Sequence, residues 1–411
     1  MRIAEINIAM DGSTGKIMLQ IAQTARNNGY EVKTYSPVVF SKVKKNKKVL
    51  PKEHTEFGFF FENGVHRCLG TLLGYNGCFS HIGTWLLIKK LKEFQPDIIH
   101  LHNLHGFCIN LPMLFRYIKR NSIRVVWTLH DCWPFTGHCP YFTMAECDRW
   151  KTGCHHCPQP RVYPKMYLDT SKRMYALKKK WFSGVKNMTL VTPSEWLADL
   201  TKQSFLKDYP VEVINNGIDL DVFQPTSSDF RNRYGITQDK HILLGVTFGW
   251  NARKGLDVFI ELAKRLDSSY QIVLVGTDDR VDAQLPTNII SIHRTQNQKE
   301  LAEIYTAADI FVNPTREEVL GMVNIESLAC GTPVVTFNSG GSPETIDETC
   351  GRVVACDDVD SLIHQIKLIF KNSSFSETAC RKRARHFEMN AKFQDYIKIY
   401  EGIVRASVRR K

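Results

Sequence analysis

The chain has 411 residues, 43% of them hydrophobic and 23% charged, which is long enough for two packed domains and too apolar for a disordered chain. Its formal net charge is +12, and the excess lies in residues 1–213, which hold 30 Lys and Arg against 16 Asp and Glu. No apolar run reaches the roughly 18 to 20 residues of a membrane span, and Glu5 near the amino terminus argues against a secretory signal, so we expect a cytoplasmic protein.

Short β-rich runs alternate with amphipathic stretches along the whole chain. The stretch 16–28 is typical of a helix, because Ile17, Ile21 and Ala25 recur every four residues and Gly29 supplies a stop. The predicted strands are mostly apolar, as buried parallel strands are. They comprise residues 96–102, 124–130, 189–193, 211–214, 241–247, 271–276, 309–313 and 332–337. This alternation predicts an α/β fold with doubly wound parallel sheets.

The segment Asp11-Gly12-Ser13-Thr14-Gly15 is expected to join the first strand to the first helix. Gly12 and Gly15 would allow the backbone to approach a ligand closely. Many strand-to-helix junctions need a glycine turn for purely structural reasons. A ligand contact and a simple turn therefore both stay open for this loop.

Lysines and phenylalanines are concentrated in one stretch of the first half. The lysines are Lys42, Lys44, Lys45, Lys47 and Lys48, and the phenylalanines are Phe57, Phe59, Phe60 and Phe61. Such a stretch favours contact with an anionic membrane surface or a phosphate-rich acceptor, and a solvated lysine loop is the alternative. Nucleic acid is disfavoured as a partner, because no recognised nucleic-acid module accompanies the charge.

His130 and Asp131 close the strand predicted over 124–130. Ligands of α/β proteins bind at the carboxyl ends of the strands, which makes His130 a candidate for orienting a substrate. We do not expect it to act as a nucleophile. A purely structural histidine is the alternative at this position.

Four cysteines, Cys139, Cys147, Cys154 and Cys157, lie within 19 residues, with His138 directly before them and His155 and His156 among them. Four thiolates at this spacing match a tetrahedral structural zinc site, which would stabilise a long irregular excursion. Unliganded core thiols and disulfides are the alternatives. Disulfides are disfavoured because the chain carries no export signal.

A turn-forming segment at 214–219 follows a predicted strand and ends the basic part of the chain. The predicted parts are a first Rossmann-like domain at 1–213 with a cysteine-rich insertion at about 132–160, a second Rossmann-like domain at 214–386, and a C-terminal stretch at 387–411. This last stretch is typical of a helix with Phe393, Ile397 and Tyr400 on its apolar face. Packing back on the first domain is one option for it.

Arg253 and Lys254 follow the strand predicted over 241–247, which places two cations at the carboxyl edge of a sheet. Two fixed cations there would stabilise the negative charge that builds on a leaving diphosphate, in the role that a metal ion plays elsewhere. The alternative is a pair of solvated surface cations.

The segment 313–335 has the order strand end, loop, helix, glycine stop, strand. Gly321 would let the backbone turn into a helix whose first free N–H groups can hold a phosphate. Glu318 precedes this helix and Glu326 lies inside it, so the two carboxylates can bind different hydroxyls of one extended ligand. An ordinary helix start with two surface glutamates is the alternative.

The same segment resembles the retaining family-4 glycosyltransferases, in which a glutamate, seven residues and a second glutamate precede Gly-Thr-Pro-Val. The stretches 215–223 and 249–257 are similar to that family in the same order, so the resemblance covers most of the chain. It implies the GT-B fold, in which two Rossmann-like domains face a central cleft.

By this resemblance, Glu326 holds the ribose of a UDP- or GDP-sugar donor and Glu318 contacts the donor sugar. The resemblance places the diphosphate on the backbone amides of Val319, Leu320, Gly321, Met322 and Val323. The other positions that it implies are His130 beside the donor sugar, Arg253 and Lys254 beside the leaving group, and Gly12 and Gly15 where the family often has paired glycines. No catalytic metal is implied, because Arg253 and Lys254 take its role, and no protein base is implied, because the leaving phosphate itself helps to take the acceptor's proton.

The cysteine-rich segment also looks like an insertion in capsule and exopolysaccharide transferases of the colanic-acid type, which use lipid-linked acceptors. We therefore predict retaining transfer of a sugar to a polyprenyl-diphosphate-linked glycan, by an enzyme peripheral to the inner face of the cytoplasmic membrane. The alternatives are a GT-B epimerase or phosphorylase, and a non-catalytic zinc-containing protein that binds polyanions. The base, the sugar, the acceptor hydroxyl and the oligomeric state stay open.

Overall fold

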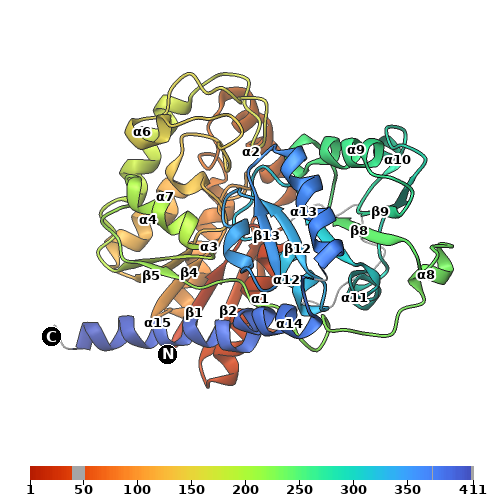
Figure 1. Cartoon of the computed structure of the whole chain (residues 1–411). Coiled ribbons are helices and arrows are strands. Elements are labelled where there is room, and N and C mark those ends of the chain that lie inside the picture. Colours follow the sequence, from red (N-terminus) through yellow and green to blue (C-terminus); the bar gives the residue numbers. More distant parts are fainter. Residues whose placement is uncertain (39–50, 373, 409–411) are drawn as a thin grey trace. The chain divides into compact units, whose positions relative to one another are not determined.

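The computed structural model describes residues 1–38, 51–372 and 374–408. The chain forms two compact units, Met1–Ile214 with Phe393–Lys411 and Asn215–Lys392, and each is built on a parallel sheet with helices around it (Figure 1). In the described part of the chain, no helix combines the length and the hydropathy that crossing a membrane requires. Lys42, Lys44, Lys45, Lys47 and Lys48 lie outside the described residues.

The first unit contains a sheet of seven parallel strands in the order β3-β2-β1-β4-β5-β6-β7. The strands are β1 (Arg2–Ile6), β2 (Glu31–Pro37), β3 (His54–Phe57), β4 (Ile98–Leu101), β5 (Arg124–Thr128), β6 (Met188–Thr192) and β7 (Val211–Val213). The helices are α1 (Gly12–Asn27), α2 (Phe60–Leu73), α3 (His81–Phe94), α4 (Leu111–Arg120), η1 (Trp133–Phe135), α5 (Arg149–Thr152), α6 (Ser171–Phe182), α7 (Glu195–Gln203) and α15 (Met389–Val408).

The second unit contains six parallel strands in the order β10-β9-β8-β11-β12-β13. The strands are β8 (His241–Val246), β9 (Tyr270–Val275), β10 (Ile289–Ile292), β11 (Ile310–Asn313), β12 (Val334–Phe337) and β13 (Gly351–Val354). The helices are α8 (Phe230–Arg233), η2 (Ala252–Lys254), α9 (Leu256–Arg265), α10 (Asp279–Asp282), α11 (Gln298–Ala307), α12 (Met322–Ala329), η3 (Ser342–Thr345), α13 (Val359–Asn372), α14 (Glu377–Ala384) and η4 (Arg385–Phe387).

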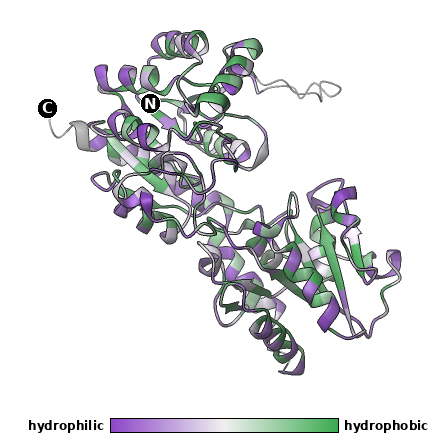
Figure 2. Cartoon of the chain, turned by 90° about the horizontal axis from the view of Figure 1, so that it is seen from above, coloured by the Kyte–Doolittle hydropathy of each residue, from purple (hydrophilic) through white to green (hydrophobic). Residues whose placement is uncertain are grey.

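Both faces of the second sheet are buried. Leu243 packs in one hydrophobic cluster and its neighbour Leu244 in the other, because successive side chains of a strand point to opposite faces. Figure 2 shows the strands of this sheet largely in green, the colour of hydrophobic residues. Burial on both faces explains why these strands are continuous apolar runs in the sequence.

In the first sheet, β2 and β3 follow β1 on one side, and β4 and the later strands follow on the other side. The second sheet has the same reversal between β8 and β11. Such a reversal leaves room outside the carboxyl ends of the two strands, where ligands of doubly wound folds bind. The loops after β1 and β4, and those after β8 and β11, are therefore the positions at which each unit can hold a ligand. Every predicted site residue outside the cysteine loop lies on these loops, on the helices that follow them, or directly after the neighbouring strand β5.

The predicted doubly wound α/β fold is confirmed, and the predicted strands coincide with β4 to β9, β11 and β12. Five strands lie outside that set: β1, which is predicted only as a first strand without bounds, and β2, β3, β10 and β13. Three of them, β3, β10 and β13, are edge strands, and all five contain exposed or half-buried positions, so they do not form continuous apolar runs.

The predicted start of the first helix is wrong. Helix α1 begins at Gly12, so Gly12 and Gly15 lie in its first turn and not in a connecting loop. Residues 12–14 are exposed or half-buried, and this turn has no apolar face until Gly15. Hydrophobic periodicity therefore detects the helix only from the next turn onward.

Candidate functional site

The start of α12 is a tight backbone turn. Gly321 precedes the helix with φ of +86°, a left-handed conformation that favours glycine. The first amides of a helix have no carbonyl partner one turn back, so those of Met322 and Val323 can donate to an anion, whereas the Asn324 N–H already donates to the Gly321 carbonyl at 3.0 Å. The buried side chain of Asn324 fixes this turn, because its Nδ2 donates to Ser342 Oγ and Thr345 Oγ1, both at 3.0 Å, and its Oδ1 accepts from Asn313 Nδ2 at 2.8 Å.

Lys254 and Glu318 form an ion pair directly before this turn, with 2.7 Å between Lys254 Nζ and Glu318 Oε2. Each side chain is only 19% exposed. Burial by itself would raise the pKa of Glu318, but the Lys254 ammonium outweighs burial and the pKa lies below its ordinary value. Glu318 is therefore a carboxylate, and the partly buried pair presents both signs of charge beside the helix start.

Close backbone contacts join the loop that carries Lys254 to the loop that carries Glu318. The N–H of Arg316 donates to the carbonyl of Arg253 at 2.9 Å, and Arg253 Nη1 donates to the carbonyl of Glu317 at 3.3 Å. Gly340, at φ of +56°, passes so close to Glu318 that a Cβ would lie 1.7 Å from the Glu318 carbonyl oxygen. These contacts hold the predicted cations and Glu318 at one place in the second unit.

Glu326 lies in the second turn of α12 and is half-buried. The hydroxyl of Tyr305 on α11 donates to Glu326 Oε2 at 3.0 Å. Tyr305 is fully buried, and burial together with the neighbouring Glu326 carboxylate raises its pKa well above the ordinary value, so it remains a donor. Tyr305 thus fixes the orientation of the carboxylate on α12.

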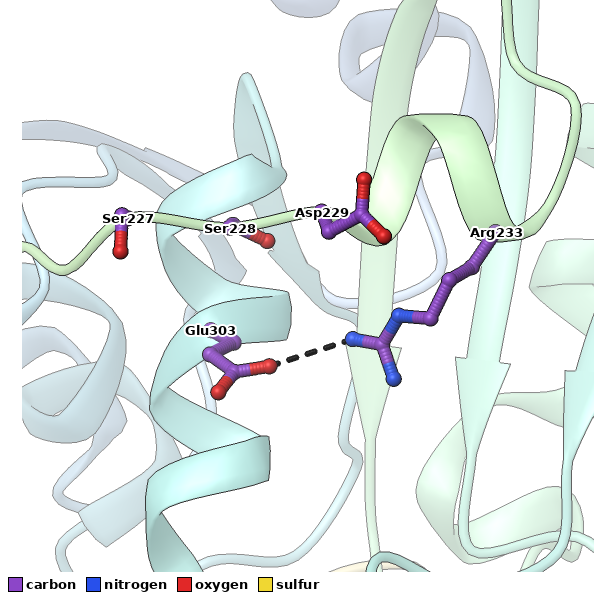
Figure 3. Close-up of a pocket in the computed structure, with 5 residues that line it drawn as sticks. All are labelled: Ser227, Ser228, Asp229, Arg233 and Glu303. Atoms are coloured by element: carbon purple, nitrogen blue, oxygen red, sulfur yellow. Dashed lines mark hydrogen bonds and ion pairs between the residues drawn. The ribbon is translucent and has the colours of Figure 1, made fainter.

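An open pocket elsewhere in the second unit is separate from these residues. Figure 3 shows its lining of Ser227, Ser228, Asp229, Arg233 and Glu303, in which Arg233 Nη2 lies 3.1 Å from Glu303 Oε2. None of the predicted site residues lines it. Arg233, the only cation among these lining residues, is paired with Glu303, and the four-residue helix α8 that starts here has the acidic Asp229 at its N-cap, so the pocket is poorly suited to a phosphate.

In the first unit, the space next to Gly15 is filled by its own chain. A Cβ at Gly15 would lie 2.4 Å from the carbonyl carbon and oxygen of Met10, whereas a Cβ at Gly12 would meet nothing within 4 Å. Gly12 instead has φ of +80°, which itself favours glycine. The requirement for glycine at both positions therefore follows from the local backbone, and the predicted donor contact is not needed to explain it.

Asn7 organises the loops at the reversal point of the first sheet. It is fully buried, its Nδ2 donates to the Ala9 carbonyl at 2.8 Å and to Thr14 Oγ1 at 3.1 Å, and its Oδ1 accepts from the Asn103 N–H at 3.2 Å. The loops after β1 and β4 are thus tied to each other. Sequence analysis did not single out Asn7.

His130 lies directly after β5 and is half-buried. Its Nε2 is 3.1 Å from His102 Nδ1, and the two imidazoles stack. Burial, and then the neighbouring histidines, lower the pKa of His130 well below its ordinary value, so the ring is neutral. Its neighbour Asp131 points elsewhere, since Oδ2 lies 2.9 Å from His105 Nε2 and Oδ1 accepts from the Trp133 N–H.

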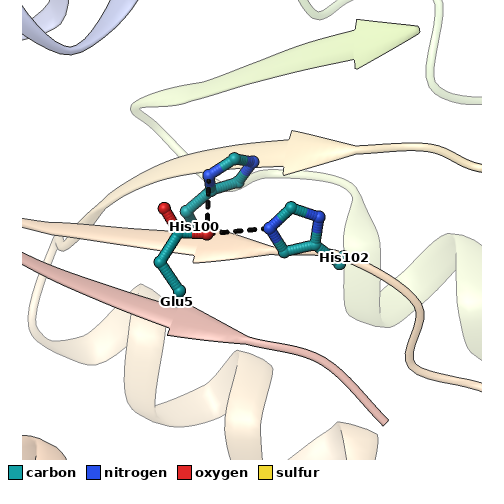
Figure 4. A group of neighbouring side chains, drawn as sticks. All are labelled: Glu5, His100 and His102. Atoms are coloured by element: carbon teal, nitrogen blue, oxygen red, sulfur yellow. Dashed lines mark hydrogen bonds and ion pairs between the residues drawn. The ribbon is translucent and has the colours of Figure 1, made fainter. Parts of the chain in front are cut away.

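Behind His130 lies a buried polar network that sequence analysis missed. His102 Nε2 and His100 Nδ1 lie 2.8 Å and 3.1 Å from the same oxygen of Glu5 (Figure 4). Tyr400 on α15 donates its hydroxyl to the other Glu5 oxygen at 3.0 Å. A signal was present in the sequence, because a glutamate on β1 and a histidine on β4 stand within otherwise apolar strands.

The predicted zinc ligands gather in the loop after η1, and none of them is disulfide-bonded. The thiols of Cys139 and Cys157 share a hydrogen bond, and the electrostatic neighbours of Cys154 include Cys147 and Cys157. The N–H of Gly137 donates to Cys154 Sγ at 3.1 Å.

The cysteine sulfurs are less closely gathered than the donor atoms of two other clusters. Among the described residues, the sets of three or more candidate ligands whose donor atoms all lie within 4.8 Å of one another are Glu5 with His100 and His102, and the exposed Asp279 with Asp282 and His293.

Two family models match the chain in sequence. The model described as Glycosyltransferase Family 4 matches residues 14–222, and the model described as Glycosyl transferases group 1 matches residues 228–391. A protein of Escherichia coli K12 named as the colanic acid biosynthesis glycosyl transferase WcaC is 22% identical over 321 residues, which are 75% of this chain and 77% of that protein.

Solved structures share the fold over nearly the whole chain. Sucrose-phosphate synthase of Thermosynechococcus elongatus superposes with a TM-score of 0.71 at 16% identity, over 98% of this chain and 99% of the other. Anabaena Alr3699/HepE in complex with UDP and glucose superposes with a TM-score of 0.68 at 14% identity, over 98% and 100%. At such low identity these likenesses concern the fold.

Proposed function

This chain belongs to glycosyltransferase family 4 and has the GT-B fold, and we propose that it transfers a sugar, with retention, from a nucleotide sugar to a lipid-linked glycan. The observation that carries the proposal is the Lys254–Glu318 pair, 2.7 Å apart and directly before the glycine turn that opens α12. The ammonium of Lys254 and the first amides of α12 can bind a diphosphate, and the carboxylate of Glu318 can bind the hydroxyls of the sugar that the diphosphate bears. The UDP complexes of the Anabaena structure support such a donor.

In the donor half, we assign the diphosphate to the backbone amides of residues 320–323, because the Val319 N–H already donates to Glu318 Oε1 at 3.1 Å. The Glu326 carboxylate, which Tyr305 holds in orientation, then accepts from a ribose hydroxyl. Arg253 and Lys254 stabilise the charge on the leaving diphosphate, and Glu318 accepts from hydroxyls of the donor sugar. A UDP- or GDP-sugar satisfies these contacts equally well.

In the acceptor half, the first unit supplies His130, which we propose orients the donor sugar. The acceptor hydroxyl displaces the diphosphate from the same face of the sugar, which retains the anomeric configuration, and the leaving phosphate takes the acceptor's proton. This displacement requires no protein nucleophile. The Gly12 turn lies at the reversal point of the same sheet, where the acceptor or the donor phosphate can approach.

An exposed aromatic surface at the starts of α2 and α3 supports a lipid-linked acceptor at a membrane. Phe61 is 80% exposed and Trp85 is 56% exposed. The two helix starts are adjacent, because the Glu62 carboxylate accepts from the N–H groups of Ile82 and Gly83 at 2.7 and 2.8 Å. Exposed Lys89 follows Trp85 by one helical turn, so apolar and basic groups share this face and match an anionic bilayer.

The double substitution Phe61→Glu and Trp85→Glu is expected to lower binding to vesicles of anionic phospholipid at least 10-fold. It removes apolar area that the bilayer would bury, and it adds negative charge that the anionic lipid repels. Vesicle flotation measures the bound fraction. Val353→Glu is the matched control, since Val353 is 45% exposed in the other unit and should leave binding unchanged. Equal flotation of the double variant and the wild type would remove this surface from the proposal.

We also propose that the cysteine loop holds a structural zinc ion through Cys139, Cys147, Cys154 and Cys157. The residues fit such a group in their chemistry: the thiols are neighbours, and a backbone N–H already donates to one sulfur. The Nε2 of the buried His138 has no hydrogen-bond partner, which is consistent with a loop that is completed by a further group.

Glu326→Ala is expected to weaken binding of the nucleotide-sugar donor by roughly 10- to 100-fold, because a hydrogen bond to a charged group contributes about 1.5 to 3 kcal/mol. Calorimetry with a panel of UDP- and GDP-sugars measures it. Glu303→Ala is the control, since Glu303 pairs with Arg233 in the separate pocket of Figure 3. Failure of every nucleotide sugar to bind, or unchanged affinity in Glu326→Ala, would overturn the donor assignment.

The same panel, incubated with lipid-linked glycan acceptors, tests the reaction by mass spectrometry. A glycan lengthened by one sugar with the donor's anomeric configuration is the expected product. Release of the sugar only to water or to phosphate would favour the phosphorylase alternative, and inversion at the anomeric carbon would exclude retention.

A further inference from the structure

A chain of hydrogen-bond partners runs from a buried carboxylate to His130. Glu5 Oε2 lies 2.8 Å from His102 Nε2, and His102 Nδ1 lies 3.1 Å from His130 Nε2. Glu5 is fully buried and His102 is 1% exposed, whereas His130 is half-buried. The three residues come from β1, the end of β4 and the end of β5, which are neighbouring strands. The chain therefore leads from the sheet interior to the edge where ligands bind.

The first link fixes the proton of His102. Three groups point at Glu5, namely His102 Nε2, His100 Nδ1 and the Tyr400 hydroxyl. Burial by itself would raise the pKa of Glu5, but the imidazoles of His100 and His102 outweigh it and lower the pKa to about 2. An ionised carboxylate only accepts, so His102 must carry its proton on Nε2. Burial lowers the pKa of His102 to about 4, so at neutral pH its Nδ1 has no proton.

The second link fixes the proton of His130. Since His102 Nδ1 carries only a lone pair, the hydrogen bond of 3.1 Å exists only when His130 Nε2 carries a proton and donates it. The neutral His130 then has its lone pair on Nδ1, the nitrogen that His102 does not contact. We propose that Glu5, through His102, is a positioning residue that sets the tautomer of His130, so that His130 Nδ1 accepts a hydrogen bond from the substrate.

His100 and Tyr400 lie at hydrogen-bond distance from the Glu5 carboxylate but are not part of the series of hydrogen bonds from Glu5 through His102 to His130. His100 Nε2 faces Thr128 Oγ1 at 2.8 Å, and His100 Nδ1 faces the Tyr400 hydroxyl at 2.6 Å. Glu5, His100 and His102 are also a conceivable metal-ligand set, but their facing atoms lie at hydrogen-bond distance from one another. His102 Nδ1 and His100 Nε2 are occupied by further protein partners, which identifies a hydrogen-bonded network.

The consequence for substrate rests on the proposed function. A histidine that only accepts at its outer nitrogen selects a group that donates, which excludes the phosphate oxygens of a nucleotide sugar. Since the proposed function assigns the ribose to Glu326 in the other unit, the donating group that remains for His130 is a hydroxyl of the transferred sugar. The fixed tautomer means that His130 need not change its protonated nitrogen during turnover.

The tautomer is tested without substrate, on the full chain labelled with 15N-histidine. The expected spectrum shows a protonated Nε2 and a bare Nδ1 for His130, with a coupling across the hydrogen bond to the unprotonated Nδ1 of His102. His130→Gln assigns the resonances. A proton on His102 Nδ1, or the absence of a coupling between the two rings, would overturn the proposal whether or not any donor is turned over.

Kinetics of the variants give the second readout. Glu5→Gln and His102→Phe are expected to lower kcat by about 10- to 100-fold with little change in the KM for the donor, which is typical of losing a partner that orients another group. Thr128→Val is the matched control, because Thr128 is equally buried and its hydroxyl contacts His100 and Tyr396, which lie outside the Glu5–His102–His130 chain.

The outcomes separate the two proposals. Unchanged His130 resonances in Glu5→Gln and His102→Phe, or an equal loss of kcat in Thr128→Val, would show that the network is only structural. If the expected tautomer is observed but no nucleotide sugar binds, the proposed function fails and the positioning role stands.

Discussion

Lys254→Ala is expected to lower kcat for sugar transfer by about 100- to 1000-fold, with a smaller change in the KM for the donor. Lys254 Nζ lies 2.7 Å from Glu318 Oε2, and the pair is only 19% exposed, so its charge acts in an environment poor in water. Removing one fixed group that stabilises developing charge has a cost of this size in other enzymes. Steady-state kinetics over a range of donor concentrations, with acceptor in excess, measures it.

The matched control for this variant is Lys264→Ala. Lys264 is on α9 of the same unit, is 64% exposed, and lies 4.0 Å from Glu261, so its loss removes the same charge without touching the site. Lys254→Arg is expected to recover part of the rate because it keeps a cation there, although its geometry differs. A rise in KM with unchanged kcat would mean that Lys254 binds the donor equally in the ground state and the transition state, contrary to the proposal.

A fall in activity must also be separated from a fall in stability. Glu318 has a lowered pKa in the folded protein because Lys254 outweighs burial, so its ionisation stabilises the fold above the unfolded pKa of about 4.3. That stabilisation is lost as the pH falls through the lower, folded pKa. Lys254→Ala removes the main cause of the lowering, so its unfolding free energy at pH 7 should be reported beside kcat.

Zinc is expected at about one equivalent per chain after purification without added metal. Its removal by a chelator should lower the thermal unfolding midpoint, because a structural zinc site supplies part of the folding free energy of its loop. Cys154→Ser should lose most of the metal, since it removes one of the four proposed sulfur ligands, the one that also accepts the Gly137 N–H. Elemental analysis by mass spectrometry gives the metal content, and calorimetry gives the midpoint.

Cys356→Ser is the control for this series, because Cys356 is an exposed cysteine in the second unit. It should keep both the metal and the midpoint of the wild type. Less than a tenth of an equivalent of zinc in the wild type would exclude the site. Full zinc content in Cys154→Ser would mean that the metal is bound elsewhere.

Features with a local signal in the amino-acid sequence could be predicted before the structure was known. Buried parallel strands need continuous apolar runs, so the class of fold and most strands could be predicted. The turn at Gly321 with Glu318 before it and Glu326 after it could also be predicted, because loop, helix start and glycine lie within a few residues. The edge strands β3, β10 and β13 and the polar first turn of α1 were missed, since none of them has a periodic apolar face.

The side-chain contacts between polar residues that are far apart in the sequence depend on the tertiary structure. Lys254 and Glu318 are 64 positions apart, and their contact depends on the pairing of β8 with β11. Glu5 and His102 are 97 positions apart, and Tyr400 reaches Glu5 across 395 positions because α15 belongs to the first unit. Strand order and the return of a terminal helix are set by the packing of the whole core, so no local pattern records them. In the sequence His130 is a single histidine after a strand, and the fold makes it the end of a chain of hydrogen bonds.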